Sequence, residues 1–371
     1  MSDNNRVTEN PSVAFRTSYE ILSSHLEEIN SMFKVYEVNR SDETIYLYGT
    51  PLLDINIIYR RLWNVFNSKG YQISFTYEPG EYIMVISPVQ KKKERVWINI
   101  VLAVATFFTT MIAGSAMYGV DFVNDPAGII KGLPFTLAIM TVLGSHEMGH
   151  YVAARIHGMN TSLPYFIPFP TIIGTMGAMI SHRGPIPDRK SLFDVGVSGP
   201  IIGLIASVIV TVIGLSLEPV SVTPQDGSMI EIQLPFLFTA IMNSMGVIGE
   251  TIHPIAFAGW VGMFITVLNL MPAGQLDGGH AIRAMIGDRA RYISSITPFV
   301  LLLLGVYVTY VMESNGFIWV MWAILLSFFA AAGHPSPLDD ESRLDGTRQF
   351  IGIVTFVLGI TCFTLVPFTI V

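Results

Sequence analysis

The stretch TVLGSHEMGHYVAARIHG, residues 141–158, places two histidines and a glutamate in an otherwise apolar run. Such a run is typical of a buried or membrane-embedded helix. Charged and polar side chains are costly in that setting unless they have a partner or a function. The stretch therefore raises two questions: whether this part of the chain lies in a membrane, and what the polar side chains do there.

The composition of the chain answers the first question. Of the 371 residues, 51% are hydrophobic and 13% are charged, against about 25% charged in an ordinary soluble domain. This deficit predicts an all-α polytopic membrane protein rather than a soluble enzyme. The net charge of -7 gives no indication of a nucleic-acid partner, and we expect none. The single cysteine, Cys362, excludes an intrachain disulfide and a thiolate metal site.

The first part of the chain differs in composition from the rest. Residues 13–90 alternate helical periodicity with stretches rich in β-branched and aromatic residues, such as TIYLYG at 44–49. We therefore predict a small soluble α+β domain here, preceded by a disordered segment over residues 1–12. The basic run QKKKER, residues 90–95, ends the domain. It is either a solvated linker or a cytosolic anchor for the apolar span that follows.

Residues 96–371 are predicted to form a membrane-embedded domain with about seven transmembrane helices. Each predicted span is close to the ~20 residues that a helix needs to cross a bilayer. With the N-terminus in the cytosol, the inner loops hold thirteen lysines and arginines and the outer loops hold only Lys131. This bias favours a cytosolic N-terminus and an external C-terminus in a cell membrane. The predicted spans are 96–118, 128–157, 192–217, 254–272, 296–312, 317–333 and 348–367.

The opening stretch contains the pattern H-E-x-x-H. His146 and His150 are four residues apart, so they share one face of a helix and can bind one zinc ion. Glu147 can then reach a water molecule on that ion, whose pKa zinc lowers to about 7. The alternative is a pair of histidines hydrogen-bonded within a helix bundle. The cost of an unpartnered Glu147 in an apolar span argues against it.

A catalytic zinc needs a third protein ligand. Asp277 is a candidate, because it lies in NLMPAGQLDGGH at the inner end of the fourth predicted span. The predicted topology puts it at the same depth as His146 and His150. The alternative is a turn residue, since Asp-Gly is a common turn pair. The other histidines that could complete the site are His25, His157, His182, His253, His280 and His334.

Together, HEMGH and NLMPAGQLDGG resemble the two motifs of the site-2 protease family of intramembrane zinc metalloproteases. The second motif, N-x-x-P-x-x-x-L-D-G, is matched from Asn269 to Gly278. The stretches SLFDVGVSGPIIG and AAGHPSPLDD are similar to the archaeal and plant-chloroplast branch, which includes the ethylene-dependent gravitropism-deficient and yellow-green proteins. The resemblance covers roughly residues 96–371.

The resemblance implies a function and a set of site residues. His146, His150 and Asp277 would hold one zinc ion per chain, and Glu147 would activate the attacking water. Asn269 would help to hold the substrate or the oxyanion. The expected activity is hydrolysis of a peptide bond within or near the transmembrane segment of a membrane protein, at a site on the cytosolic side of the bilayer.

Residues 163–187 are apolar but contain Pro164, Pro168 and Pro170, which disfavour a spanning helix. We predict a re-entrant, non-helical segment with a strand over 171–180. Its free edge would bind unwound substrate, with Gly174 and Gly177 as substrate-binding residues. The alternative is a loop at the membrane interface.

Three other functions are compatible with parts of the sequence. One is a different membrane zinc protease with a glutamate as third ligand, which the NLMPAGQLDGG motif disfavours. Another is a membrane transporter that uses the same residues to coordinate an ion, although such a protein does not need Glu147 beside His146. The third is an inactive scaffold, which the intact motifs disfavour. The sequence does not identify the substrate or the oligomeric state.

Overall fold

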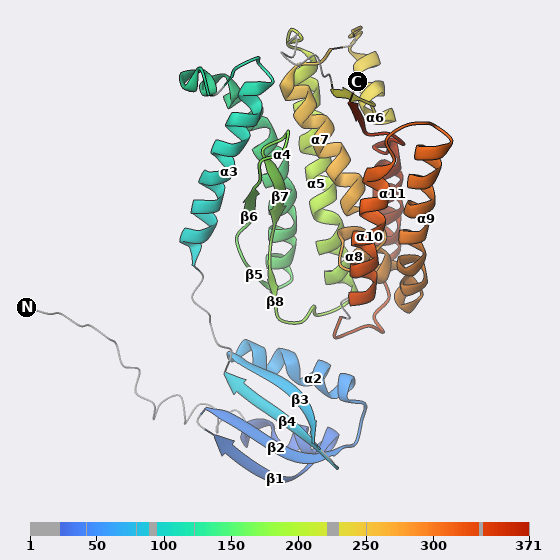
Figure 1. Cartoon of the computed structure of the whole chain (residues 1–371). Helices are drawn as coiled ribbons and strands as arrows, with labels where there is room; N and C mark the ends of the chain where they lie inside the picture. The colour runs from blue at the N-terminus through green and yellow to red at the C-terminus, as the bar shows by residue number, and fades with distance from the viewer. Residues whose placement is uncertain are drawn as a thin grey trace, which may run out of the picture. The chain divides into compact units, whose positions relative to one another are not determined.

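The chain divides into two compact units, Met1–Lys93 and Glu94–Val371, and each is described by itself. Figure 1 shows the elements of this computed structural model. The predicted disordered segment 1–12 and most of the basic run 90–95 lie outside the described residues. The structure describes residues 23–41, 43–78, 80–88, 95–121, 123–220, 230–249, 251–333 and 337–370.

The N-terminal unit contains a four-stranded antiparallel sheet in the order β1-β2-β4-β3. Buried and partly exposed side chains alternate along β2, so every second residue faces the core. The small N-terminal sheet domain predicted from the sequence is confirmed. Its elements are helical residues 23–32, β1 Phe33–Ser41, β2 Thr44–Pro51, α2 Ile55–Ser68, β3 Tyr71–Glu78 and β4 Glu81–Pro88, and its fully buried residues include Phe33, Leu47, Ile58, Leu62 and Met84.

The second unit is mostly helical (Figure 1). A short sheet of β9 Ile230–Ile232 and β10 Phe368–Ile370 lies near its C-terminus. The helices of the described part are α3 Val96–Ala116, η1 Pro126–Gly132, α4 Leu133–Ile156, α5 Arg189–Leu215, α6 Phe236–Ser244, α7 Pro254–Asn269, α8 Asp277–Ile286, η2 Gly287–Arg289, α9 Ala290–Tyr310, α10 Phe317–Ala332 and α11 Gly346–Thr361.

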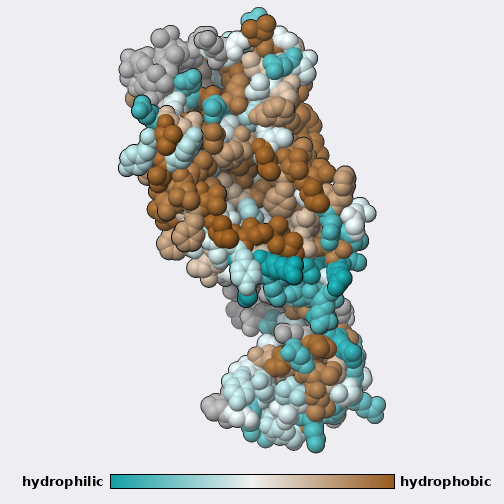
Figure 2. Space-filling view, turned by 90° about the vertical axis from the view of Figure 1, so that its right-hand side faces the viewer, coloured by the Kyte–Doolittle hydropathy of each residue, from teal (hydrophilic) through white to brown (hydrophobic). Residues whose placement is uncertain are grey.

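Four helical stretches among the described residues are long and apolar enough to cross a membrane: Val96–Ala116, Pro126–Ile156, Arg189–Leu215 and Asp277–Tyr310. Three shorter helices, α7, α10 and α11, are also apolar. Large hydrophobic side chains cover much of the visible face of this unit (Figure 2), as lipid contact requires. The mostly helical architecture is therefore confirmed, with four helical stretches that are candidates for membrane spans, and the count of seven spans stays a prediction.

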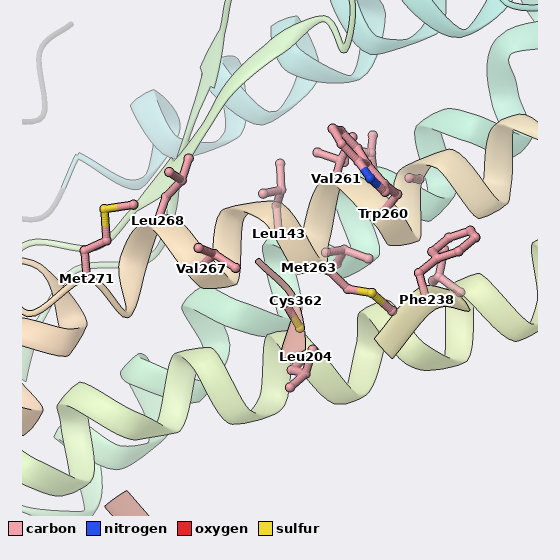
Figure 3. Packing of buried hydrophobic residues seen from close by; sticks show 14 of the residues in the cluster. Leu143, Leu204, Phe238, Trp260, Val261, Met263, Val267, Leu268, Met271 and Cys362 are labelled. Atoms are coloured by element: carbon pink, nitrogen blue, oxygen red, sulfur yellow. The ribbon is translucent and has the colours of Figure 1, made fainter. Parts of the chain in front are cut away.

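The core that supports the site lies between α4, α5 and α7. The backbones approach closely because Gly262 of α7 faces Ser207 of α5 and Val142 of α4, where a larger residue would collide. Small residues at such contacts are typical of membrane helix packing. Figure 3 shows Leu143, Leu204 and Met263 gathered in this core. The three helices thus form a tightly packed frame.

The connection between α4 and α5 is non-helical in the described structure, as predicted for 163–187. It contains two short antiparallel pairs, β5 Asn160–Thr161 with β8 His182–Arg183, and β6 Tyr165–Pro168 with β7 Thr175–Met179. The β6–β7 hairpin lies between α3 and α4 (Figure 1).

The predicted strand 171–180 is found only over 175–179. Residues 171–174 form the turn instead, because Gly174 has a φ of +75°, which interrupts an extended strand. On the other side of the hairpin, Asn99 of α3 donates to the carbonyl oxygens of Leu163 and Pro164 at 2.9 and 3.0 Å. The hairpin is thereby held against α3.

Candidate metal centre

Three side chains from two helices converge inside the helical unit. His146 and His150, one turn apart on α4, are each only 5% exposed, and their Nε2 atoms lie 3.2 Å apart. Asp277 is the first residue of α8. Its Oδ2 atom lies 3.3 Å from His146 Nε2 and 3.2 Å from His150 Nε2. The sequence predicted that Asp277 lies at the same membrane depth as His146 and His150. In the structure, their side chains lie next to one another.

This donor set fits a single metal ion. Zinc binds imidazole nitrogen and carboxylate oxygen at about 2.0–2.2 Å in a tetrahedron, whose corners are then about 3.3 Å apart. The three observed sides measure 3.2, 3.2 and 3.3 Å, so the side chains are close enough to hold one ion. Two imidazoles and one carboxylate are also a typical protein ligand set for a catalytic zinc, which keeps its fourth position open.

Helix α5 orients the histidines. The backbone carbonyl of Val195 lies 2.7 Å from Nδ1 of His150, so Nδ1 donates to it and Nε2 is left to face the site. Gly199 and Gly203 of α5 lie directly against the two imidazoles. A Cβ atom at Gly199 would overlap the His150 ring, and one at Gly203 would lie 2.8 Å from Nδ1 of His146.

These three α5 residues were missed as site residues by the sequence analysis. All three lie in the stretch SLFDVGVSGPIIG, residues 191–203, which was used only to support the family resemblance. The four-residue spacing of Gly199 and Gly203 was the available signal, because small residues at that spacing let two membrane helices approach closely. A backbone carbonyl such as that of Val195 carries no signal in the sequence.

Glu147 lies beside the three ligand atoms but is not part of their group. It is 7% exposed, and its carboxylate faces the backbone N–H of Ile180, the residue that follows β7. The carboxylate therefore lies where α4 meets the β6–β7 hairpin. A buried carboxylate next to an ion site is well placed to accept a proton from a water molecule there.

The structure brings one of the three predicted substrate-binding residues to the centre. Asn269 ends α7, and its Nδ2 atom lies 3.1 Å from His146 Nε2. Gly174 and Gly177 lie in the hairpin instead. Gly174 packs against the backbone of Thr109 in α3, whereas Gly177 has a φ of +109° and no atom within 4 Å of an added Cβ. The substrate-binding roles of all three stay predictions.

The other described histidines have different surroundings. His157 pairs with Asp194 at 2.8 Å, and His253 caps α7 by accepting the N–H of Ile255. His182 is mostly buried, and its Nδ1 has no hydrogen-bond partner among the described residues. Burial lowers the pKa of the His182 imidazole. His334 lies outside the described residues.

The profile of one protein family, peptidase family M50, matches residues 134–305. Residues 134–305 are therefore similar to the peptidase family M50 domain. The resemblance to site-2 proteases expected from the sequence is thereby confirmed. The M50 domain contains every residue of the candidate metal centre, from His146 on α4 to Asp277 on α8.

Curated relatives carry names of the same kind. The chain is 29% identical over 247 residues to the "Probable zinc metalloprotease EGY1, chloroplastic" of Oryza sativa subsp. japonica, which covers 64% of this chain and 41% of the relative. The Arabidopsis thaliana protein of that name is 28% identical, covering 63% and 43%. The EGY2 protein of Oryza sativa subsp. indica is 27% identical, covering 87% and 61%.

The chain spans about half the length of these curated relatives. No solved structure matches it significantly. The M50 similarity therefore rests on sequence, and the candidate metal centre rests on the geometry given above.

Proposed function

We propose that this chain is an intramembrane zinc metalloendopeptidase that hydrolyses a peptide bond within or near the transmembrane segment of membrane protein substrates. One observation carries the proposal: three ligand atoms at the mutual spacing of a zinc site lie beside a buried carboxylate among apolar helices. The names of the relatives as probable zinc metalloproteases support it. The transporter alternative has no support from the family or from these names.

Each residue of the site has a proposed task. His146, His150 and Asp277 would hold the ion. When bound, zinc supplies a Lewis acid that lowers the pKa of a water molecule to near 7. Glu147 accepts the proton of the attacking water and passes it on to the leaving amine. The carbonyl of Val195 keeps the His150 ring in the orientation that presents Nε2.

The metal content of the purified protein tests this proposal. We expect about one zinc per chain, and we expect Asp277→Ala to lose most of it, because two imidazoles alone leave the three-ligand set incomplete. Asp288→Ala is the control, since this carboxylate lies just after α8 but its side chain is 84% exposed. Elemental analysis after dialysis gives the stoichiometry. Full zinc retention in Asp277→Ala would remove Asp277 from the site.

We also propose that the β6–β7 hairpin binds the substrate as an extended strand. A peptide bond in a helix is shielded, and its carbonyl is engaged in the i to i−4 hydrogen-bond ladder, so it must unwind before water attacks. Unwinding in lipid leaves backbone groups without partners, at a cost of several kcal/mol each. A strand edge beside Glu147 would offset this cost by accepting and donating those hydrogen bonds.

Two glycines of the α4–α5 connection allow a matched test of the hairpin. Gly177 and Gly184 both have positive φ and no atom within 4 Å of an added Cβ. Gly177→Val should slow cleavage at least about tenfold with zinc retained, because it disturbs the strand next to Glu147. Gly184→Val, which carries the same backbone strain outside β7, should have a much smaller effect. Equal losses in the two variants would argue against a substrate-binding hairpin.

We further propose seven membrane spans, with residues 13–90 as a cytosolic domain and 96–371 as the membrane-embedded protease domain. Two observations support seven spans: α7, α10 and α11 are apolar, and thirteen of fourteen loop lysines and arginines fall on one predicted side. The N-terminus and the site would then face the cytosol, and the C-terminus the outside of a cell membrane. The relatives named above are called chloroplastic, which leaves the cell membrane location to experiment.

Cysteine labelling of intact cells tests the orientation. In a Cys362→Ser background, Gln225→Cys should react with an impermeant thiol reagent, because it lies in the predicted outer loop. Lys92→Cys should react only after the cells are opened. Both positions lie outside the described residues. The reverse pattern would invert the topology, and a lack of reaction at both positions in intact cells would contradict the proposed location.

A further inference from the structure

The loop between α10 and α11 contacts several elements that carry the metal centre. We call residues 338–345 of this loop the strap. The backbone N–H of Leu338 donates to the carbonyl of Ile186, and that of Asp339 to the carbonyl of Pro187, both at 2.9 Å. The strap therefore runs beside the segment that leads into α5, the helix that lies against both imidazoles.

The strap is also bound to α8, the helix that begins with Asp277. Arg283 of α8 is only 4% exposed. Its guanidinium donates to both carboxylate oxygens of Asp340, at 3.1 and 2.6 Å. Bidentate pairs of this kind fix orientation as well as distance. A second arginine, Arg189 at the start of α5, donates to the carbonyl of Ala284 in α8 at 3.0 Å and lies 4.0 Å from Asp340.

Among the described residues, Arg283 has one other carboxylate partner, Asp288, which differs from Asp340 in its position in the chain and in its exposure. Asp288 lies 2.9 Å from Arg283 but follows α8 directly in the chain. It therefore cannot tie α8 to another element. Its side chain is 84% exposed, whereas that of Asp340 is 34% exposed, so water also weakens the Asp288 pair more. Without Asp340, Arg283 could turn to Asp288 and water, and α8 would be released from the strap.

A small displacement of α8 matters because of what it carries. Asp277 must stay within 3.3 Å of two imidazoles that are themselves held by α5 and the α4 backbone. Helix α8 has ten residues, and Arg283 lies less than two turns from Asp277. Because α8 is short and moves as a rigid unit, a shift at Arg283 also displaces the carboxylate of Asp277.

We propose that the strap positions Asp277, with the Asp340–Arg283 ion pair as a contact that fixes α8 against α5 together with the Arg189–Ala284 hydrogen bond. Asp340 is then a positioning residue of the metal centre, because it acts on Asp277 through Arg283 and α8. The inference rests on the proposed zinc site. It adds a determinant of metal affinity that lies more than 60 residues beyond Asp277 in the sequence.

The test compares zinc affinity in three variants of the full chain, measured by competition with a chromophoric chelator. Asp340→Asn should bind zinc about ten- to a hundredfold more weakly, the usual range for residues that orient metal ligands. Asp288→Asn removes the other partner of Arg283 and should leave the affinity unchanged. Asp340→Glu keeps a carboxylate within reach of Arg283 and should retain most of the affinity.

Two further measurements separate positioning from a general loss of fold. The unfolding temperature of the metal-free protein reports stability alone. The visible absorption of the cobalt-loaded protein reports ligand geometry, and it should change in Asp340→Asn but not in Asp288→Asn. An Asp340→Asn protein that unfolds earlier yet binds zinc with wild-type affinity and spectrum would overturn the inference.

The outcome for the wild-type chain keeps the two proposals apart. If the wild-type chain binds no zinc, the metal centre itself is wrong and the positioning role falls with it. If the wild-type chain binds zinc and Asp340→Asn binds it equally well, only the positioning role is wrong. Equal losses in Asp288→Asn and Asp340→Asn would also overturn it, since only Asp340 belongs to the strap.

Discussion

Replacing Glu147 by glutamine should slow peptide hydrolysis by about 10²–10⁴-fold, the range that a positioned general base contributes. The zinc content should not change, because Glu147 is outside the group of three ligand atoms. Glutamine has nearly the same size and can still accept the N–H of Ile180 through its amide oxygen. It cannot accept the proton of the attacking water. The measurement is the cleavage rate of a membrane-spanning substrate in liposomes, with zinc content determined on the same sample.

A neighbouring substitution provides the control for this experiment. Met148 follows Glu147 on α4 but is 41% exposed on the outer surface of the helix. Met148→Leu should therefore cleave at the wild-type rate. If Glu147→Gln cleaves as fast as Met148→Leu, Glu147 is not the base. If it loses zinc together with activity, Glu147 has been assigned the wrong task.

The ligands and the base could be predicted from sequence because they follow a helical period. His146 and His150 share a face at a spacing of four, and Glu147 is adjacent. Asp277 required the count of spans and the family resemblance, since Asp-Gly alone is also a turn signal. The high share of hydrophobic residues likewise predicted the apolar helices. The strand prediction over 171–180 was too long, because the left-handed conformation of Gly174 depends on its packing against α3.

The supporting contacts could not be predicted in the same way. In the sequence, Arg283 and Arg348 are two of the thirteen lysines and arginines that fall on one predicted side of the membrane. In the structure, Arg283 is bound by Asp340, and Arg348 makes a bidentate pair with Asp194 at 2.8 and 2.7 Å. These partners are 57 and 154 residues apart. No local pattern links residues at such separations, so only the folded chain reveals which charges are engaged.

The glycines of α5 lead to the second large effect. Gly199→Ala should weaken zinc binding by about ten- to a hundredfold, because its Cβ would occupy space now filled by the His150 ring. The ring would have to leave the carbonyl of Val195, which now sets its orientation at 2.7 Å. Zinc affinity by chelator competition is the measurement, with circular dichroism to show that the helices remain formed.

Gly346→Ala separates this steric effect from the general effect of adding a methyl group to a helix. Gly346 begins α11, has no positive φ and has no atom within 4 Å of an added Cβ. Alanine is favoured over glycine in a helix by up to about 1 kcal/mol, so this control should keep its zinc and its fold. Unchanged zinc affinity in Gly199→Ala would mean that α5 does not lie against His150. The close approach of α5 to α4 would then not be what holds His146 and His150 in place.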